Sequence, residues 1–128
     1  MIDHVIINVS NLKAGKAFYK KALAPLGYKV SFEFKSETTK TKAVAFIGSQ
    51  IGFVIAQGPP KMPPNHVAFQ VKNRALVKAF YKAAIAAGGR DFGEPRLYPE
   101  YQKDYFGAFV LDPDGHNIEA VCHEASRS

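Results

Sequence analysis

The stretches DHVIINVSN (residues 3–11) and NHVAFQVKN (residues 65–73) decide the fold, because they are two copies of one pattern. Each has a histidine in second place, valines at two matching positions and a closing asparagine. The alternating apolar side chains predict a half-buried strand in both copies. The valines share the face that packs on the core, so the two histidines are expected on the opposite face.

The repeat continues beyond these strands. The shift of 62 positions that carries residue 4 onto residue 66 also aligns KAFYK at 16–20 with KAFYK at 78–82. In both copies an asparagine suited to cap a helix precedes apolar residues at helical spacing. A strand followed by a helix is therefore predicted twice.

Further strands complete each half of the chain. Three strand-like runs in the first half occupy residues 28–34, 42–48 and 51–57. The proline-rich segment 58–65 cannot continue a sheet ladder and is predicted as a linker.

In the second half, the segment 93–106 contains two prolines and four aromatic residues and is predicted as a long loop or lid. Two strands follow it, joined by the turn sequence DPDGH. These elements predict a single α+β domain in which two βαβββ modules form an open, eight-stranded barrel-like sheet with the helices outside. The predicted boundaries are 1–57 for module one, 58–65 for the linker, 66–123 for module two and 124–128 for a tail.

The composition limits the class of protein. The chain has 128 residues, 47% hydrophobic and 22% charged, as expected of one globular domain. We find no leader pattern and no apolar run near the roughly 20 residues that span a bilayer. The single cysteine, Cys122, favours a cytoplasmic location. The net charge of +6 comes from dispersed lysines typical of solvated helix faces, so neither nucleic acid nor a membrane is expected as a partner.

Three side chains form a candidate metal site. His4 and His66 occupy equivalent positions on the non-helical faces of their strands. On the last strand, the apolar residues at 118, 120 and 122 suit packing on helices, which turns Glu119 toward the same cavity as the histidines. Two imidazoles and a carboxylate form a metal site with open positions, typical of non-haem iron and compatible with zinc or manganese. The alternative is that the histidines are ordinary hydrogen-bonded residues.

Four segments together resemble a known family: DHVIINVSN, AFYKKALAPLGY, NHVAFQVKN and GAFVLDPDGHNIEAV. They are similar to the vicinal oxygen chelate superfamily, which includes glyoxalase I, bleomycin-resistance proteins, fosfomycin-resistance transferases and extradiol dioxygenases. The resemblance implies two βαβββ modules around a divalent metal ion, with His4, His66 and Glu119 on the family's ligand positions. It also implies a homodimer, with the site either within one chain or shared between two.

The fourth ligand position departs from the glyoxalase pattern. Aligning IGFVI of the first module with NIEAV of the second places Phe53 opposite Glu119, and phenylalanine cannot bind a metal. Glyoxalase I has a glutamate there that also transfers protons, so the resemblance argues against an ordinary glutathione-dependent glyoxalase. The remaining three ligands are similar to those of fosfomycin transferases and extradiol dioxygenases, in which the substrate's adjacent oxygens chelate the metal.

Other residues are candidates for the walls of the cavity. The expected substrate-binding residues are Phe53, Gln70, Tyr101, Tyr105 and His123. Tyrosines can hydrogen-bond or stack on a substrate, and a histidine can move protons near neutral pH. His116 is expected to be solvated in its turn, and DPDG fits a β-turn better than a calcium loop.

The leading hypothesis is an enzyme that uses one divalent metal ion (iron, manganese, zinc or nickel) on a small, oxygen-chelating molecule. The reaction type, whether lyase, transferase or oxygenase, is left open. The alternative is a metal-free protein that sequesters a small molecule, as the bleomycin-resistance branch does. Bound metal in purified protein separates the two.

Overall fold

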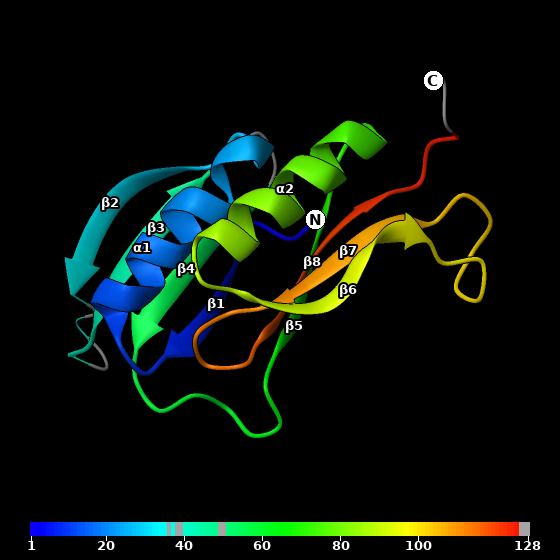
Figure 1. The fold of residues 1–128 in the computed structure, drawn as a ribbon. Helices are drawn as coiled ribbons and strands as arrows, with labels where there is room; N and C mark the ends of the chain where they lie inside the picture. The colour runs from blue at the N-terminus through cyan, green and yellow to red at the C-terminus, as the bar shows by residue number, and fades with distance from the viewer. Residues whose placement is uncertain (36, 38–39, 49–50, 126–128) are drawn as a thin grey trace.

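The computed structural model describes residues 1–35, 37, 40–48 and 51–125, so the last three residues of the expected tail lie outside the described part. Both predicted βαβββ modules are present (Figure 1). The first contains β1 (His4–Val9), α1 (Leu12–Ala22), the short 3-10 helix η1 (Ala24–Leu26), β2 (Lys29–Lys35), β3 (Lys42–Ile47) and β4 (Gly52–Gln57). The second contains β5 (His66–Gln70), α2 (Arg74–Ala86), β6 (Arg90–Leu97), β7 (Phe106–Leu111) and β8 (Asn117–Cys122).

The strands form two separate sheets, one from each module. Their orders are β1-β4-β3-β2 and β5-β8-β7-β6, with the first and last strands of each module paired in parallel. The sheets are not closed into a barrel; they lie beside each other, and α1 and α2 cover the same side (Figure 1). The expected single barrel-like sheet is therefore two four-stranded sheets whose other faces stay open.

The helices begin where the sequence predicts. The side chain of Asn11 accepts a hydrogen bond from the Ala14 amide at 3.0 Å, and that of Asn73 accepts one from the Leu76 amide at 3.0 Å. The apolar faces of both helices pack with the sheets in one core, in which Phe18, Tyr19, Phe80 and Ile118 are buried. No helix among the described residues is long and apolar enough to cross a membrane.

The predicted long loop at 93–106 is shorter than expected. Strand β6 continues to Leu97, so the connection to β7 spans only residues 98–105. Pro95 lies where the pairing of β6 with β7 shifts register, between Gly93 and Arg96. A proline is tolerated there because a bulge does not require its missing amide hydrogen.

Candidate metal centre

Strands β5 and β8 bring His66 and Glu119 together. The parallel register pairs Ala68 with Glu119, and the His66 Nε2 lies 2.8 Å from the Glu119 Oε1. The Glu119 side chain is 1% exposed, whereas that of His66 is 52% exposed. A carboxylate buried so completely requires hydrogen-bond donors, and the imidazole supplies one of them.

Tyr105 supplies the second donor. Its hydroxyl donates to the Glu119 Oε2, so that each oxygen of the carboxylate has one partner. Burial raises the pKa of Tyr105, and the hydrogen bond to Glu119 and the charge of that carboxylate raise it further. Tyr105 therefore keeps its proton at neutral pH and acts there as a hydrogen-bond donor. Gly107 lies against this pair, since a Cβ added there would approach the Tyr105 Cε1 to 3.3 Å, closer than an ordinary van der Waals contact.

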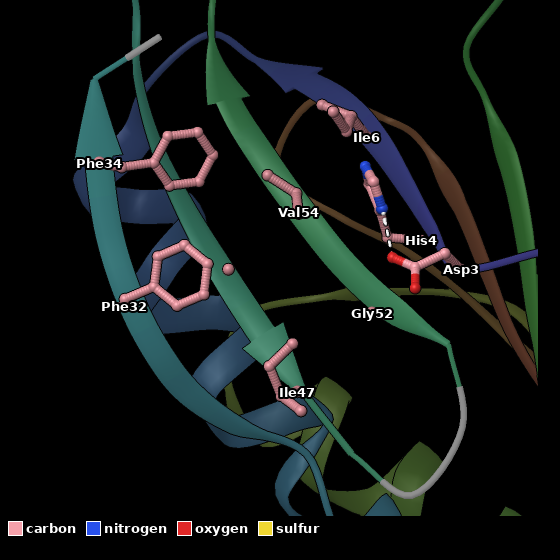
Figure 2. Close-up of a pocket in the computed structure, with 9 residues that line it drawn as sticks. Asp3, His4, Ile6, Phe32, Phe34, Ile47, Gly52 and Val54 are labelled. Atoms are coloured by element: carbon pink, nitrogen blue, oxygen red, sulfur yellow. Dashed lines mark hydrogen bonds and ion pairs between the residues drawn. The ribbon is translucent and has the colours of Figure 1, made fainter.

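His4 occupies the equivalent position in the other sheet. Its Nδ1 donates to the Asp3 Oδ1 at 2.7 Å, since a carboxylate can only accept (Figure 2). The opposite ring nitrogen, Nε2, has no hydrogen-bond partner among the residues that the structure describes, and the side chain is 50% exposed. A histidine whose second nitrogen is held by a carboxylate is the usual arrangement for a metal ligand.

Two of the three expected ligands lie side by side in the second sheet, and His4 lies in the first. Among the described residues, the one group of three potential ligands within 4.8 Å of one another is Asp112, Asp114 and His116. His4 is therefore not at that distance from both His66 and Glu119. His4 belongs to the first sheet and the other two residues to the second, and the two sheets are not closed into a barrel.

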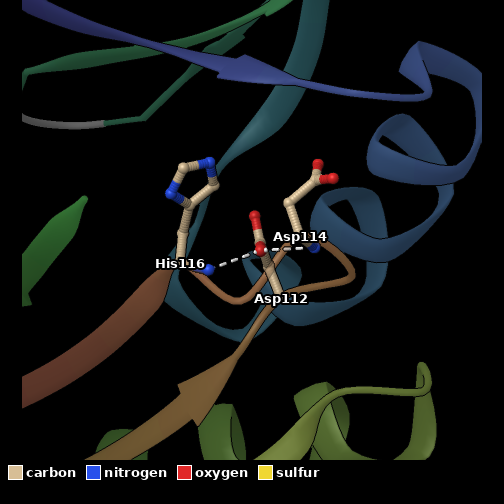
Figure 3. Close-up of side chains that lie close together, drawn as sticks. All are labelled: Asp112, Asp114 and His116. Carbon is tan, nitrogen blue, oxygen red and sulfur yellow. Dashed lines mark hydrogen bonds between the residues drawn. The ribbon is translucent and has the colours of Figure 1, made fainter. Parts of the chain in front are cut away.

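The cluster of Asp112, Asp114 and His116 lies in the turn between β7 and β8 (Figure 3). Asp112 accepts hydrogen bonds from the Tyr19 hydroxyl and from two amides of its own turn. Asp114 accepts from the amide and the hydroxyl of Ser10. The carboxylates are thus already used to hold the second module against the first.

His116 completes this contact between the modules. Its Nδ1 accepts from the Asn65 amide at 2.9 Å, and its Nε2 donates to the Asn8 carbonyl at 2.9 Å. The expectation that His116 is solvated was wrong, because the residue is fully buried. An ion bound to Asp112, Asp114 and His116 would therefore compete with the contacts that join the modules.

The structure corrects the placement of Phe53. His4 pairs with Gly52 and His66 pairs with Asn117, so superposing the modules places Val54, not Phe53, opposite Glu119. A shift of one residue reverses the face of a strand. Phe53 accordingly lies in the helix-side core and is fully buried, with its ring 4.9 Å from that of Tyr19 and 5.4 Å from that of Phe69. It cannot contact a substrate on the open face.

No sequence signal marked this error. Strand β4 reads GFVIAQ, and its first four residues are all buried, so the alternation that identifies faces elsewhere is missing. The conclusion drawn from the alignment is unchanged, because Val54 lacks a ligand atom just as phenylalanine does.

The remaining expected substrate-binding residues lie near Glu119, with one exception. The rings of Tyr101 and Tyr105 are 5.2 Å apart, and the ring of His123 lies 5.4 Å from that of Tyr105. Tyr98 extends this group, since it stacks on Tyr101 at 5.7 Å. Gln70 is exposed at the end of β5 and has no contact with this aromatic group among the interactions of the described residues.

A family model, the Glyoxalase/Bleomycin resistance protein/Dioxygenase superfamily, matches residues 1–120. The chain belongs to this superfamily. No curated protein sequence matched it. The resemblance stated from the sequence motifs is confirmed.

Solved structures of the superfamily share the fold. A glyoxalase/bleomycin resistance protein from Albidiferax ferrireducens is 24% identical, with a TM-score of 0.74, over 95% of this chain and 98% of that one. A domain from a Frankia species is 16% identical, with a TM-score of 0.78, over 99% and 94%. A variant of the fosfomycin resistance protein FosX from Listeria monocytogenes, solved with manganese(II) and a dihydroxypropylphosphonic acid, is 19% identical, with a TM-score of 0.69, over 95% and 91%.

Proposed function

We propose that this superfamily member is an enzyme that binds one divalent metal ion through His66, Glu119 and His4, with His4 supplied by a second copy of the chain. The observation that carries the proposal is the pair formed by the buried Glu119 and the half-exposed His66. A carboxylate held beside a half-exposed imidazole offers an oxygen and a nitrogen ligand to an ion.

The spacing of the pair suits an ion. Two ligand atoms about 2.1 Å from a metal ion and at right angles to each other are about 3.0 Å apart. The His66 Nε2 and the Glu119 Oε1 are 2.8 Å apart, so little movement is needed once the shared proton is lost. Nitrogen and oxygen ligands suit manganese, iron, nickel or zinc, and the FosX relative was solved with manganese(II).

The location of His4 supports a site shared between two copies. Its side chain lines a pocket on the first sheet, while the other two proposed ligands belong to the second sheet. A homodimer in which the first sheet of one copy faces the second sheet of the other brings one His4 to each pair and covers both open faces. Each dimer then contains two equivalent sites.

The chain's own residues have definite tasks in such a site. Tyr105 and Asp3 orient a carboxylate and an imidazole through hydrogen bonds, which fixes the ligands before an ion arrives. The bound ion would act as a Lewis acid on the oxygens of a small substrate. Tyr101 and His123 lie beside Tyr105, where they can contact that substrate. A reducing compartment such as the cytoplasm suits the buried, unpaired Cys122.

A metal titration tests the proposal. Protein stripped with chelator is titrated with manganese(II) as the wild type and as the variants His66→Ala and Glu119→Gln. We expect one tight site per chain in the wild type and loss of that site in both variants. His123→Ala is the matched control, since it removes a histidine that is not a proposed ligand. Absence of tight binding in the wild type overturns the metal proposal and favours the metal-free binding protein.

A further inference from the structure

Arg74, the first residue of α2, carries a charge that does not suit that position. The first turn lies at the positive end of the helix dipole, where acidic residues are the stabilising ones. The shift of 62 positions aligns Arg74 with Leu12 of the first module, an apolar residue that packs against the core. The Arg74 side chain is 21% exposed, and its buried Nε has no hydrogen-bond partner among the described residues. A buried donor without a partner lowers stability, so the helix that Arg74 begins does not explain this residue.

The guanidinium group of Arg74 contacts the two residues that flank Tyr105. Its Nη2 lies 3.9 Å from the Asp104 Oδ1. Its central carbon, Cζ, lies 5.1 Å from the centre of the Phe106 ring, within the range of a cation–π contact. Phe106 is buried at the start of β7, so the core fixes this side of the contact. Arg74 therefore joins the start of α2 to the chain on both sides of Tyr105.

The backbone at Asp104 needs support of this kind. Its φ angle is +63°, in the left-handed region that residues other than glycine adopt at a cost. Such a conformation persists where the surrounding contacts hold it, and the ion pair with Arg74 holds the Asp104 side chain. The next residue, Tyr105, donates its hydroxyl hydrogen to the Glu119 Oε2. The direction of the chain at Asp104 therefore affects whether the Tyr105 hydroxyl reaches the carboxylate.

We propose that Arg74 is a positioning residue, which holds the segment 104–106 so that the Tyr105 hydroxyl stays on Glu119. This inference rests on the proposed function, in which Glu119 binds the metal ion. Without the guanidinium group, the segment is held less firmly and the Glu119 Oε2 loses its donor for part of the time. A ligand that is oriented less well binds the ion more weakly.

The charge of Arg74 makes the direction of the effect informative. A guanidinium group repels a divalent cation, so Arg74→Gln should raise manganese(II) affinity if charge alone matters. The positioning role predicts the opposite, a fall of roughly 3- to 10-fold, smaller than the loss for Tyr105→Phe because the hydroxyl is still present. Lys78→Gln is the matched control and should not lower the affinity. Lys78 carries the same charge one turn along α2, with its Nζ 5.8 Å from the centre of the Phe106 ring, whereas the ion pair with Asp104 belongs to Arg74.

A double-mutant cycle distinguishes positioning from a general loss of structure. Manganese(II) affinity is measured by calorimetry on the full chain for the wild type, Arg74→Gln, Tyr105→Phe and the double variant. If Arg74 acts through Tyr105, Arg74→Gln should change the affinity by less than about twofold once residue 105 lacks its hydroxyl. Equal losses in both backgrounds overturn the inference. An unchanged or raised affinity for Arg74→Gln alone also overturns it.

A conservative variant keeps the test decisive if Arg74→Gln does not fold by circular dichroism. Arg74→Lys retains a charge that can pair with Asp104 but lacks the planar group that stacks on Phe106. It takes the place of Arg74→Gln in the same cycle, with an expected fall in manganese affinity of about two- to threefold. The same two outcomes overturn the inference.

A second cycle without metal separates this inference from the proposed function. The urea midpoints of the same four proteins are measured in EDTA, where they report on the hydrogen bond between Tyr105 and Glu119 itself. We expect the shift of the double variant to be smaller than the sum of the two single shifts. If the wild type binds no manganese, the metal proposal is overturned and this cycle decides the positioning role, which additive shifts overturn. If manganese binds, the affinity cycle decides it.

Discussion

Mixing two variants that each lack the tight metal site tests whether that site is shared between two copies of the chain. His66 and Glu119 are 2.8 Å apart in the second sheet, and His4 lies in the first sheet. In a shared site, a His4→Ala chain keeps an intact pair and a Glu119→Gln chain keeps an intact His4. A heterodimer of the two therefore contains one complete site, formed by His4 of one chain and the pair of the other.

The number of tight manganese sites that the mixture should regain follows from the ways in which the two variants pair. Random pairing of equal amounts gives about half heterodimers, each with one complete site out of two, so about a quarter of the wild-type number of tight sites returns. The variants are mixed, unfolded and refolded together, and tight manganese(II) sites are counted by electron paramagnetic resonance of the free ion. Each variant refolded alone should show none of these sites.

The matched control mixes two variants whose substitutions both lie in the second sheet. In a heterodimer of His66→Ala and Glu119→Gln, each of the two sites lacks one ligand, so no tight site should return. If the His4→Ala and Glu119→Gln mixture also recovers nothing, although both variants refold as dimers, the shared site is refuted. Recovery in the control mixture would refute the assignment of His66 and Glu119 to one half-site.

Three further predictions follow from the same contacts. Tyr105→Phe leaves the buried Glu119 Oε2 without a donor, so manganese affinity should fall by roughly 10- to 100-fold in a titration. Folding raises the pKa of Tyr105 above its ordinary value of 10.0, so the contribution of this residue to stability is fully present below pH 10 and is lost as the pH rises beyond it. Tyr105→Phe should lessen the loss of stability above pH 10 in denaturant titrations. His116→Ala removes two hydrogen bonds of a buried side chain, one to Asn65 of the linker and one to Asn8 of the first module. It should lower the free energy of unfolding by about 2–4 kcal/mol, measured in urea, without changing manganese affinity. Val54→Glu should remain folded and should bind manganese more tightly, because the new carboxylate acts as a fourth ligand. Phe53→Glu should unfold the chain, because it places a charge in the core. Equal circular dichroism spectra for the two variants would contradict the corrected register.

Local sequence patterns were sufficient to predict most of the fold. The duplicated strand and helix, the capping asparagines at 11 and 73 and the faces of β1, β5 and β8 all depend on periodicities of a few residues. Strand parity correctly turned Glu119 away from the helices, and the structure then placed it beside His66. Patterns of this kind can be read along the chain because neighbouring residues create them.

The predictions were wrong where the local sequence pattern carries no information about the face of a strand or about contacts with the other module. Strand β4 is apolar on both faces, so only its pairing with β1 shows that Val54, and not Phe53, shares a face with His4. The burial of His116 was missed for a similar reason. A histidine in a turn is ordinarily solvated, but this one is buried and contacts Asn65 of the linker and Asn8 of the other module.

The sequence by itself determined that the chain contains two equivalent modules and that a histidine of each lies on an open sheet face. Tertiary structure decided which ligands meet. The pairing of β5 with β8 joins His66 to Glu119, while the separation of the two sheets keeps His4 apart from them. The physical reason is that side-chain parity is a property of one strand, whereas the distance between ligands depends on how whole sheets pack, which no short stretch of the chain encodes.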